Sequence, residues 1–249
     1  MRNRNISATG SHSIAIIMPA FNEGSTISNT ICEINDKIIK KTSGTKLLVF
    51  EDGSKDNTKE VLKMLAKKYT WLQIHLGTER LGYPKAVKNA FSSVDVSKFK
   101  YILFTDSDGQ YDPADFFKLL PLIKKNDIDM VVAQRKNRAE PFYRVILSKG
   151  LHLIERTLFN IQYSDVTSAF RLMKPKVCKQ VASEVKFSNY NFWLEFTARA
   201  SMKNVKTATI QVSYRKRKGG GSTKVYHISN IPKIVSNEFG ALIKTRFDG

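Results

Sequence analysis

Cysteine is nearly absent from this chain of 249 residues, which contains only Cys32 and Cys178. Two cysteines cannot form a disulfide scaffold or supply the four ligands of a structural zinc ion. The histidines are few and scattered, so we expect structural or surface roles for them rather than metal binding. The scarcity of cysteine favours a reducing compartment, and a chain of this length can bury a sizeable core without cross-links.

Long hydrophobic runs are missing as well. No stretch approaches the roughly 18 consecutive apolar residues of a membrane-spanning helix. The N-terminal residues 1–13 are basic but lack the apolar segment of a signal peptide. We therefore expect a single domain over residues 1–249 that does not span a membrane. Binding to the surface of a membrane stays compatible with this expectation.

Acidic residues are scarce relative to basic ones. The sequence has 22 Asp and Glu against 41 Lys and Arg, which gives a formal net charge of +19 and a pI near 9.9. Such a surface attracts nucleic acid, anionic lipid headgroups or phosphorylated substrates, and charge alone does not choose among them. The hydrophobic fraction of 42% is ordinary for a globular protein, which excludes disorder over the whole length.

Short apolar runs alternate with helical patterns in the first half of the chain. The runs predict strands at residues 13–18, 46–50, 71–76, 101–105 and 129–133. Apolar stripes between them predict helices near residues 27–38, 61–66, 86–91 and 116–123. This alternation predicts an α/β fold, with a Rossmann-like, mostly parallel sheet flanked by helices over residues 13–135.

The second half is less regular. Residues 142–161 and 192–202 have helical patterns, and residues 205–214 resemble a strand. The tail, residues 225–247, is an amphipathic helical pattern in which Pro232 is expected to break the first turn. Residues 142–161 and 225–247 mix apolar and basic side chains, which suits either helices at a membrane surface or helices that pack on the core.

Polar residues follow the first four predicted strands, where open α/β sheets bind their ligands. Asp106 and Asp108 follow the fourth strand and alternate with Gln110, so their oxygens can converge on one Mg²⁺ or Mn²⁺ that also binds a nucleoside diphosphate. A solvated turn or helix cap before Pro113 explains the same residues about equally well.

Asp52 follows the second strand and precedes Gly53. This pair is typical of a turn, and Ser54 or Asp56 is placed to cap the next helix. The Asp52 carboxylate is also a candidate acceptor for a nucleobase N–H. Both interpretations can hold, because Asp52 and the capping residue differ.

Taken together, these spacings resemble the family 2 glycosyltransferases, and within them the branch of dolichol-phosphate mannose synthases and polyprenyl-phosphate glycosyltransferases. The resemblance covers about residues 13–230. The matching positions, in chain order, are residues 19–23, Asp52 to Ser54 with Asp56, Gly82, residues 106–110, Gln134 with Arg135, Arg144 with Ser148, residues 165–171, and Arg217 with Gly220 and Ser222.

The resemblance implies a GT-A fold with one nucleotide-sugar site, in which residues 13–135 bind the donor and residues 136–249 bind the acceptor and end in amphipathic helices. By analogy the donor site would be formed by Pro19, Ala20, Asn22, Glu23, Asp52, Gly82 and Asp106, with Asp106, Asp108 and Gln110 on the metal. The catalytic set would be Asp108, Arg135, Arg144, Ser148 and Arg217. Arg135, Arg144 and Ser148 would hold the phosphate of a lipid acceptor, and Arg217 would close over the diphosphate.

The implied reaction moves mannose or glucose from a nucleotide-sugar such as GDP-mannose or UDP-glucose to dolichyl or polyprenyl phosphate, with inversion. A phosphate monoester is largely dianionic at neutral pH and needs no protein base, and guanidinium groups match its geometry. The expected location is peripheral, on the cytoplasmic face of a membrane, or in the catalytic domain of a membrane protein, and no nucleic-acid partner is expected.

Two alternatives remain open at this point. A sugar hydroxyl as acceptor would require a general base, for which Glu195 or Asp165 is the candidate. A non-enzymatic module that binds nucleic acid or acidic lipid suits the charge but leaves the carboxylates at the strand ends unexplained. The sequence also departs from the family pattern, since Tyr83 and Pro84 follow Gly82 where Lys or Gly is usual and Ala169 stands where Gly is common.

Overall fold

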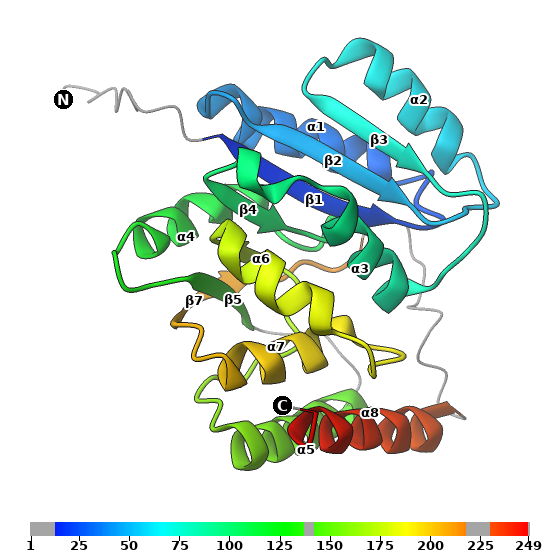
Figure 1. Ribbon diagram of the computed structural model, residues 1–249. Coiled ribbons are helices and arrows are strands. Elements are labelled where there is room, and N and C mark those ends of the chain that lie inside the picture. Colours follow the sequence, from blue (N-terminus) through cyan, green and yellow to red (C-terminus); the bar gives the residue numbers. More distant parts are fainter. Residues whose placement is uncertain (1–12, 137–141, 218–229, 249) are drawn as a thin grey trace.

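A mixed seven-stranded sheet forms the centre of the computed structural model, which describes residues 13–136, 142–217 and 230–248 and, for residues 142–149, the backbone alone. The strand order is β3-β2-β1-β4-β6-β5-β7 (Figure 1). Only β6 runs antiparallel to its neighbours, so the predicted mostly parallel sheet is confirmed. The strands are β1 (Ile14–Ala20), β2 (Lys46–Glu51), β3 (Leu72–Leu76), β4 (Tyr101–Phe104), β5 (Met130–Lys136), β6 (Arg171–Met173) and β7 (Thr207–Ser213).

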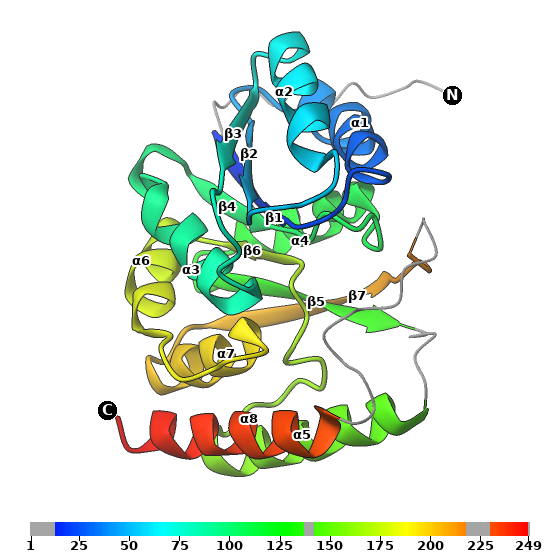
Figure 2. The same cartoon turned by 90° about the vertical axis from the view of Figure 1, so that its right-hand side faces the viewer.

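Helices cover both faces of this sheet. Helices α1, α2 and α4 lie on one face and α3, α6 and α7 on the other, while α5 and α8 form a further layer that packs on α7 (Figure 2). Their bounds are α1 (Ile27–Lys37), α2 (Thr58–Lys68), α3 (Tyr83–Ser93), α4 (Phe116–Ile123), α5 (Phe142–Phe159), α6 (Pro175–Val181), α7 (Phe192–Met202) and α8 (Ile231–Arg246), with short 3-10 turns η1 (Ile39–Lys41), η2 (Val96–Lys98), η3 (Pro113–Asp115) and η4 (Ala182–Glu184).

Strand β1 is buried along its whole length, as expected for an apolar strand covered on both faces. It continues through Pro19 to Ala20, beyond the end that the proline predicted. Pairing with β4 stops at Ile17, so past that residue β1 pairs with β2 alone. A missing N–H is tolerated there because one side of the strand no longer needs a donor.

Helix α8 differs in detail from the prediction for the tail. It begins at Ile231, and Pro232 lies in its first turn without breaking it, because first-turn N–H groups have no acceptor within the helix. The predicted residues 225–229 lie outside the described part of the chain. Within the ranges that are described, no helix combines the length and the apolar composition needed to cross a bilayer.

The inner faces of α5 and α8 belong to the protein core. Phe159 of α5 and Leu242 of α8 are buried in a cluster with Leu194 and Ala198 of α7. Packing on the core therefore accounts for the inner half of both amphipathic patterns. Their outer faces still expose large apolar side chains, including Leu153 and Phe239.

Candidate active site

Three carboxylate-bearing segments meet at the carboxyl edge of the sheet, as the strand order requires. Glu23 follows β1, Asp52 follows β2, and Asp106 and Asp108 follow β4, which flanks β1 on its other side. The Asp52 backbone N–H donates to Ala20 O at 2.9 Å, which joins the first two segments. The predicted donor-binding residues therefore come from adjacent strands.

Asp106 and Asp108 form a half-buried carboxylate pair. Loss of contact with water, and then the charge of Asp108, raise the pKa of Asp106 to about 7. Burial also raises the pKa of Asp108, while the Gln110 N–H, Arg217 and Arg135 lower it. The negative charges of the two carboxylates repel each other. A divalent cation bound by their oxygen atoms would relieve that repulsion.

Among the described residues, no cluster of three or more His, Cys, Asp or Glu side chains has the arrangement of a complete metal site. A cation here would thus draw further ligands from substrate oxygens, as Mg²⁺ commonly does with phosphates. Gln110 is not turned toward the carboxylates: its Nε2 donates to Arg215 O at 3.1 Å and its Oε1 accepts from Tyr214 at 3.0 Å. Its role as a ligand stays a prediction.

Arg217 reaches the carboxylates from the far end of the chain, after β7. It pairs with Glu23 Oε1, and its charge also lowers the pKa of Asp108. Glu23 Oε2 accepts from the Thr26 hydroxyl at 2.6 Å. Burial nevertheless raises the pKa of Glu23, with Thr26 and Arg217 acting in the opposite direction. Gly220 and Ser222, which the resemblance places in the same motif, lie outside the described residues.

Asp52 organises the loop that follows β3. Its two carboxylate oxygens accept from Leu81 N at 2.8 Å and from Gly82 N at 3.0 Å. Burial raises the pKa of Asp52, and these two amides counteract the effect. The predicted turn is present, with φ +68° at Gly53, where a Cβ would lie 2.4 Å from Glu79 C. The contact with a nucleobase remains a prediction, since both oxygens already serve the loop.

Asn22 joins the loops after β1 and β2. It has a positive φ of 52°, its N–H donates to Ser54 Oγ at 2.8 Å, and its Oδ1 accepts from Lys55 N at 2.9 Å. The N-cap residue of α2 is Asn57, whose side chain makes no capping hydrogen bond, so the predicted cap by Ser54 or Asp56 is wrong. Asp56 instead accepts from Thr58 N, at the first residue of the helix, at 3.1 Å. Asn22 therefore has an architectural role here, besides any contact with a ligand.

Arg135 lies at the end of β5 and is held by an acid. Its Nε and Nη2 donate to the two oxygens of Asp165 at 2.8 and 2.7 Å, and its guanidinium lies over the Tyr214 ring, 5.1 Å from the centroid. Its charge lowers the pKa of both Asp106 and Asp108. Arg135 thus contributes positive potential to the site, and Asp165 is committed to an ion pair rather than placed as a free base.

Glu195 is also committed to internal contacts. The side chain is fully buried and accepts from the N–H groups of Lys186, Phe187 and Ser188 at 3.0, 2.7 and 2.7 Å. It also pairs with Arg199 Nε at 2.8 Å. An internal ion pair and hydrogen bonds to loop amides explain this residue, whereas the cap of α7 is made by Asn191.

Arg144 and Ser148 lie four residues apart on α5, so the predicted helical spacing is present. Both fall within residues 142–149, whose side chains are outside the described part of the structure. Their contact with an acceptor phosphate remains a prediction.

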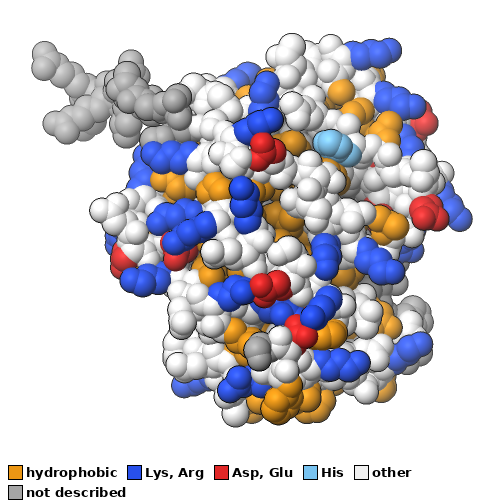
Figure 3. All heavy atoms as spheres, viewed as in Figure 1, with side chains coloured by type: hydrophobic (Ala, Val, Ile, Leu, Met, Phe, Trp, Pro, Cys, Tyr) orange, Lys and Arg blue, Asp and Glu red, His pale blue; other side chains and the backbone are white. Residues whose placement is uncertain are grey.

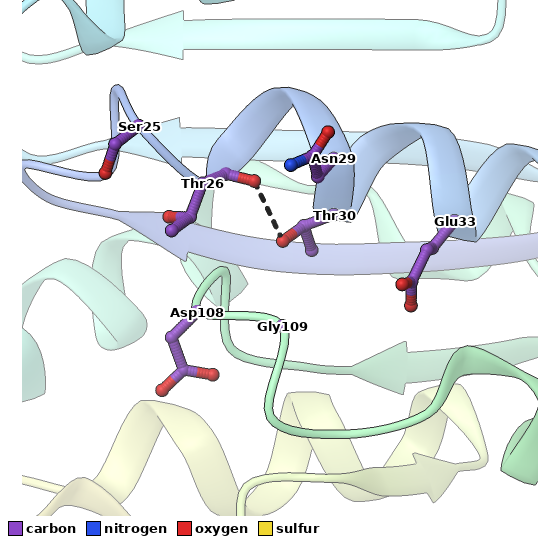
Figure 4. A pocket seen from close by; sticks show the side chains of 7 residues that line it. All are labelled: Ser25, Thr26, Asn29, Thr30, Glu33, Asp108 and Gly109. Atoms are coloured by element: carbon purple, nitrogen blue, oxygen red, sulfur yellow. Dashed lines mark hydrogen bonds between the residues drawn. The ribbon is translucent and has the colours of Figure 1, made fainter. Parts of the chain in front are cut away.

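A polar pocket of about 170 Å³ lies between the first turns of α1 and the loop that carries Asp108 and Gly109 (Figure 4). Thr30 closes one wall by donating to Ser107 O at 3.1 Å. Ligand pockets typically hold about 300–1,000 Å³, so this one would take part of a ligand, such as a sugar or a phosphate group. Sequence reasoning missed this wall, because Ser25, Asn29 and Thr30 carry no motif.

Comparison with known proteins agrees with this geometry. The sequence model of Glycosyl transferase family 2 matches residues 15–182. Two uncharacterized proteins of Methanocaldococcus jannaschii are 30% identical over 175 residues, covering 66% of this chain and 73% of the relative, and 27% identical over 228 residues, covering 88% and 90%. Glycosyltransferase AglD of Haloferax volcanii is 22% identical over 225 residues, which cover 88% of this chain but 35% of AglD.

Solved structures show the same fold. Glucosyl-3-phosphoglycerate synthase from Mycobacterium tuberculosis, in complex with Mn²⁺, UDP and glucosyl-3-phosphoglycerate, superposes with a TM-score of 0.69 over 94% of this chain and 80% of that one, at 15% identity. The same enzyme has been crystallised with Mg²⁺ and UDP, at a TM-score of 0.68. At this identity the likeness establishes the GT-A fold alone. The match of the family model over most of the chain shows that the protein belongs to glycosyl transferase family 2.

Proposed function

We propose that this chain is a metal-dependent, inverting glycosyltransferase that moves mannose or glucose from a nucleotide-sugar to dolichyl or polyprenyl phosphate at a membrane surface. The observation that carries the proposal is the pair Asp106 and Asp108 at the carboxyl edge of the sheet, with Arg217 and Arg135 within electrostatic reach. Carboxylates alone would repel a diphosphate, whereas carboxylates with a cation and arginines would bind one.

The metal is supported by the donor set. Asp106 and Asp108 offer oxygen atoms, which Mg²⁺ and Mn²⁺ prefer. Burial raises the pKa of both carboxyl groups, and the charge of Asp108 adds to the effect at Asp106. When bound, the cation would supply positive charge for the departing nucleoside diphosphate. Arg217 pairs with Glu23 in the structure. A bound diphosphate would compete with Glu23 for the Arg217 guanidinium, which would then add a second positive charge.

A phosphate acceptor is favoured over a hydroxyl by the state of the candidate bases. Glu195 is buried among backbone amides and Asp165 is paired with Arg135, so neither is placed as a free base. A phosphate monoester has a second pKa of about 6 and attacks without losing a proton to the protein.

The outer face of α5 and α8 supports a membrane location. Leu153 and Phe239 are 64% and 44% exposed there, and Phe247, directly after α8, is 83% exposed. Figure 3 shows hydrophobic side chains beside lysines and arginines at the lower end of the molecule, over these helices. Apolar side chains bordered by basic ones, in a chain of net charge +19, suit the surface of an anionic bilayer.

The deciding experiment measures release of nucleoside diphosphate from a panel of nucleotide-sugars, with and without a short polyprenyl phosphate and with Mn²⁺ or EDTA. Asp108→Ala is the test variant, and Asp127→Ala, at an exposed position, is its control. We expect release that requires both lipid phosphate and metal and is lost only in Asp108→Ala.

Other outcomes reassign the function. Metal-dependent donor binding without turnover on lipid phosphate would indicate a sugar hydroxyl as acceptor. Failure of every donor to bind, together with salt-sensitive binding of nucleic acid that survives Asp108→Ala, would favour the anion-binding module instead.

A further inference from the structure

Tyr83 connects the interior of the protein to the carboxylate pair. It is the first residue of α3, directly after Gly82, and its hydroxyl lies 2.9 Å from Asp106 Oδ1. On its other side the same hydroxyl lies 3.0 Å from Trp193 Nε1, in the first turn of α7. A hydrogen-bonded chain of three side chains therefore runs from α7 through α3 to the loop after β4.

The chemistry of the three groups determines the direction of both hydrogen bonds. An indole N–H can only donate, so Trp193 donates to the Tyr83 oxygen. An ionised carboxylate can only accept, so the Tyr83 hydroxyl gives its single proton to Asp106. The rotation of this hydroxyl is thereby set from one end by Trp193 and from the other by Asp106.

Trp193, the buried end of this series of hydrogen bonds, is tightly packed. Trp193 is 1% exposed, its ring packs edge-on against Phe104 with the centroids 4.6 Å apart, and the Arg171 guanidinium lies 4.5 Å from its centroid. Phe104 ends β4, two residues before Asp106. The tryptophan thus packs on the end of β4, directly before the loop that carries Asp106, and donates to the tyrosine that contacts Asp106.

We propose that Tyr83 is a positioning residue for the divalent cation. Its hydroxyl occupies Asp106 Oδ1 and fixes the carboxylate plane, which leaves Oδ2 for the cation. This inference rests on the proposed metal-dependent function and adds a specific residue to it. Partners that orient a metal-binding side chain typically change metal affinity by about 10–100-fold when they are removed.

The test is Mn²⁺ binding to the full chain, measured from the free Mn²⁺ signal in electron paramagnetic resonance. Tyr83→Phe removes one hydroxyl group, and we expect the dissociation constant for Mn²⁺ to rise about tenfold or more. In turnover assays the concentration of Mn²⁺ for half-maximal rate should rise in parallel, while kcat at saturating Mn²⁺ stays within a few-fold of wild type.

Tyr111→Phe is the matched control. Tyr111 is buried near the same site, but its hydroxyl contacts Ser168 Oγ at 3.2 Å and Ala169 N at 3.3 Å rather than a carboxylate. We expect Mn²⁺ to bind Tyr111→Phe as it binds the wild type. Thermal unfolding in EDTA measures the structural cost of each variant, so a general loss of packing is separated from a loss of metal affinity.

Trp193→Phe is a second variant. It removes the indole N–H that donates to the Tyr83 hydroxyl but leaves the hydroxyl itself in place. It should also weaken Mn²⁺ binding, by a smaller factor than Tyr83→Phe. Wild-type affinity in Tyr83→Phe would overturn the inference and leave the proposed function intact, provided that Asp108→Ala still abolishes binding. If wild-type protein shows no Mn²⁺ binding that depends on Asp108, the proposed function fails and the inference with it.

Discussion

The acidic residues considered for catalysis fall into two groups that the sequence does not distinguish. Asp106 and Asp108 lie together at the edge of the sheet, and their pKa values are raised by burial. Glu195 and Asp165 lie deeper, where backbone amides and an arginine neutralise each of them. The carboxylates of Asp106 and Asp108 are therefore available to bind a cation, whereas the contacts of Glu195 and Asp165 stabilise the fold.

Glu195→Gln should therefore act on stability rather than on catalysis. The change leaves Arg199 without its buried partner and replaces a charged acceptor of three amides, so we expect a loss of about 3 kcal/mol in the free energy of unfolding. Urea unfolding measures this loss, with Glu60→Gln at an exposed position of α2 as control. A stable variant without glycosyl transfer would instead identify Glu195 as a base.

Two glycines should respond oppositely to alanine. At Gly53 a Cβ would meet the backbone of Glu79 at 2.4 Å and φ is +68°, so Gly53→Ala should lose about 1–3 kcal/mol and weaken donor binding by displacing the loop after β3. Gly240 lies inside α8 with open space around it, so Gly240→Ala should gain about 0.5–1 kcal/mol. Equal unfolding midpoints for the two variants would contradict this account of the Gly53 turn.

At the scale of elements, the layer of α5 and α8 buries acids beneath an apolar surface. Glu155 of α5 is fully buried, and neither of its carboxylate oxygens has a hydrogen-bond partner within the described chain. Burial raises the pKa of Glu155 well above its ordinary value of 4.5; Arg171 lowers it and Glu238 of α8 raises it. Between the pKa of the unfolded chain and the higher pKa of the folded protein, the folded state therefore retains a proton that the unfolded chain releases.

This proton makes the stability of the layer depend on pH. The pKa of Glu155 is higher in the folded protein than the value of 4.5 in the unfolded chain. Glu155 therefore leaves the free energy of unfolding unchanged below about pH 4.5. Above that pH it lowers the free energy of unfolding by about 1.4 kcal/mol per pH unit, until the folded pKa is reached. Glu155→Gln has no carboxyl group to titrate, so its free energy of unfolding should gain on that of the wild type as the pH rises above about 4.5. Urea unfolding at several pH values measures the difference, and a constant difference would show that Glu155 does not titrate in this way.

For the molecule as a whole, charge and apolar exposure act together. The net charge of +19 attracts an anionic surface over a range that salt shortens, to about 10 Å at 0.1 M. In the proposed membrane-bound state, the exposed apolar side chains on α5 and α8 would add a short-range contact that salt does not screen. Either effect alone would give weak binding, and their combination on one face would orient the active site relative to the membrane.

Vesicle co-sedimentation tests this combination. We expect binding to phosphatidylcholine vesicles that contain phosphatidylserine, weaker binding without it, and a decline as salt rises from about 0.05 to about 0.5 M. Leu153→Gln with Phe239→Gln should reduce binding several-fold. Met64→Gln, at a 60% exposed position of α2, is the matched control and should bind like the wild type. Equal losses in both would place the contact elsewhere.

Much of the architecture was predictable because it depends on local pattern. Buried parallel strands need continuous apolar runs, and the five predicted in the first half correspond to β1 to β5. Strand β6 has three residues and escaped prediction, since so short a run has no periodicity and owes its place to pairing with β4 and β5. The predicted end of β1 before Pro19 was too early for a related reason. A proline fits where one side of a strand has no neighbour, and the sequence alone does not reveal where that is.

Motif order and apolar spacing were sufficient to predict the family, the α/β fold and the set of strand-end residues. The use of each polar group, in contrast, depends on its neighbours in the folded chain. Arg135 proved to be held by Asp165, Glu195 to be enclosed by backbone amides, and Tyr83 to bridge Trp193 and Asp106. These pairs lie 30, 7 to 9, 110 and 23 residues apart in the chain. A polar side chain binds whatever the fold brings within hydrogen-bond distance, and most of these contacts join segments that only the folded sheet and helices bring together.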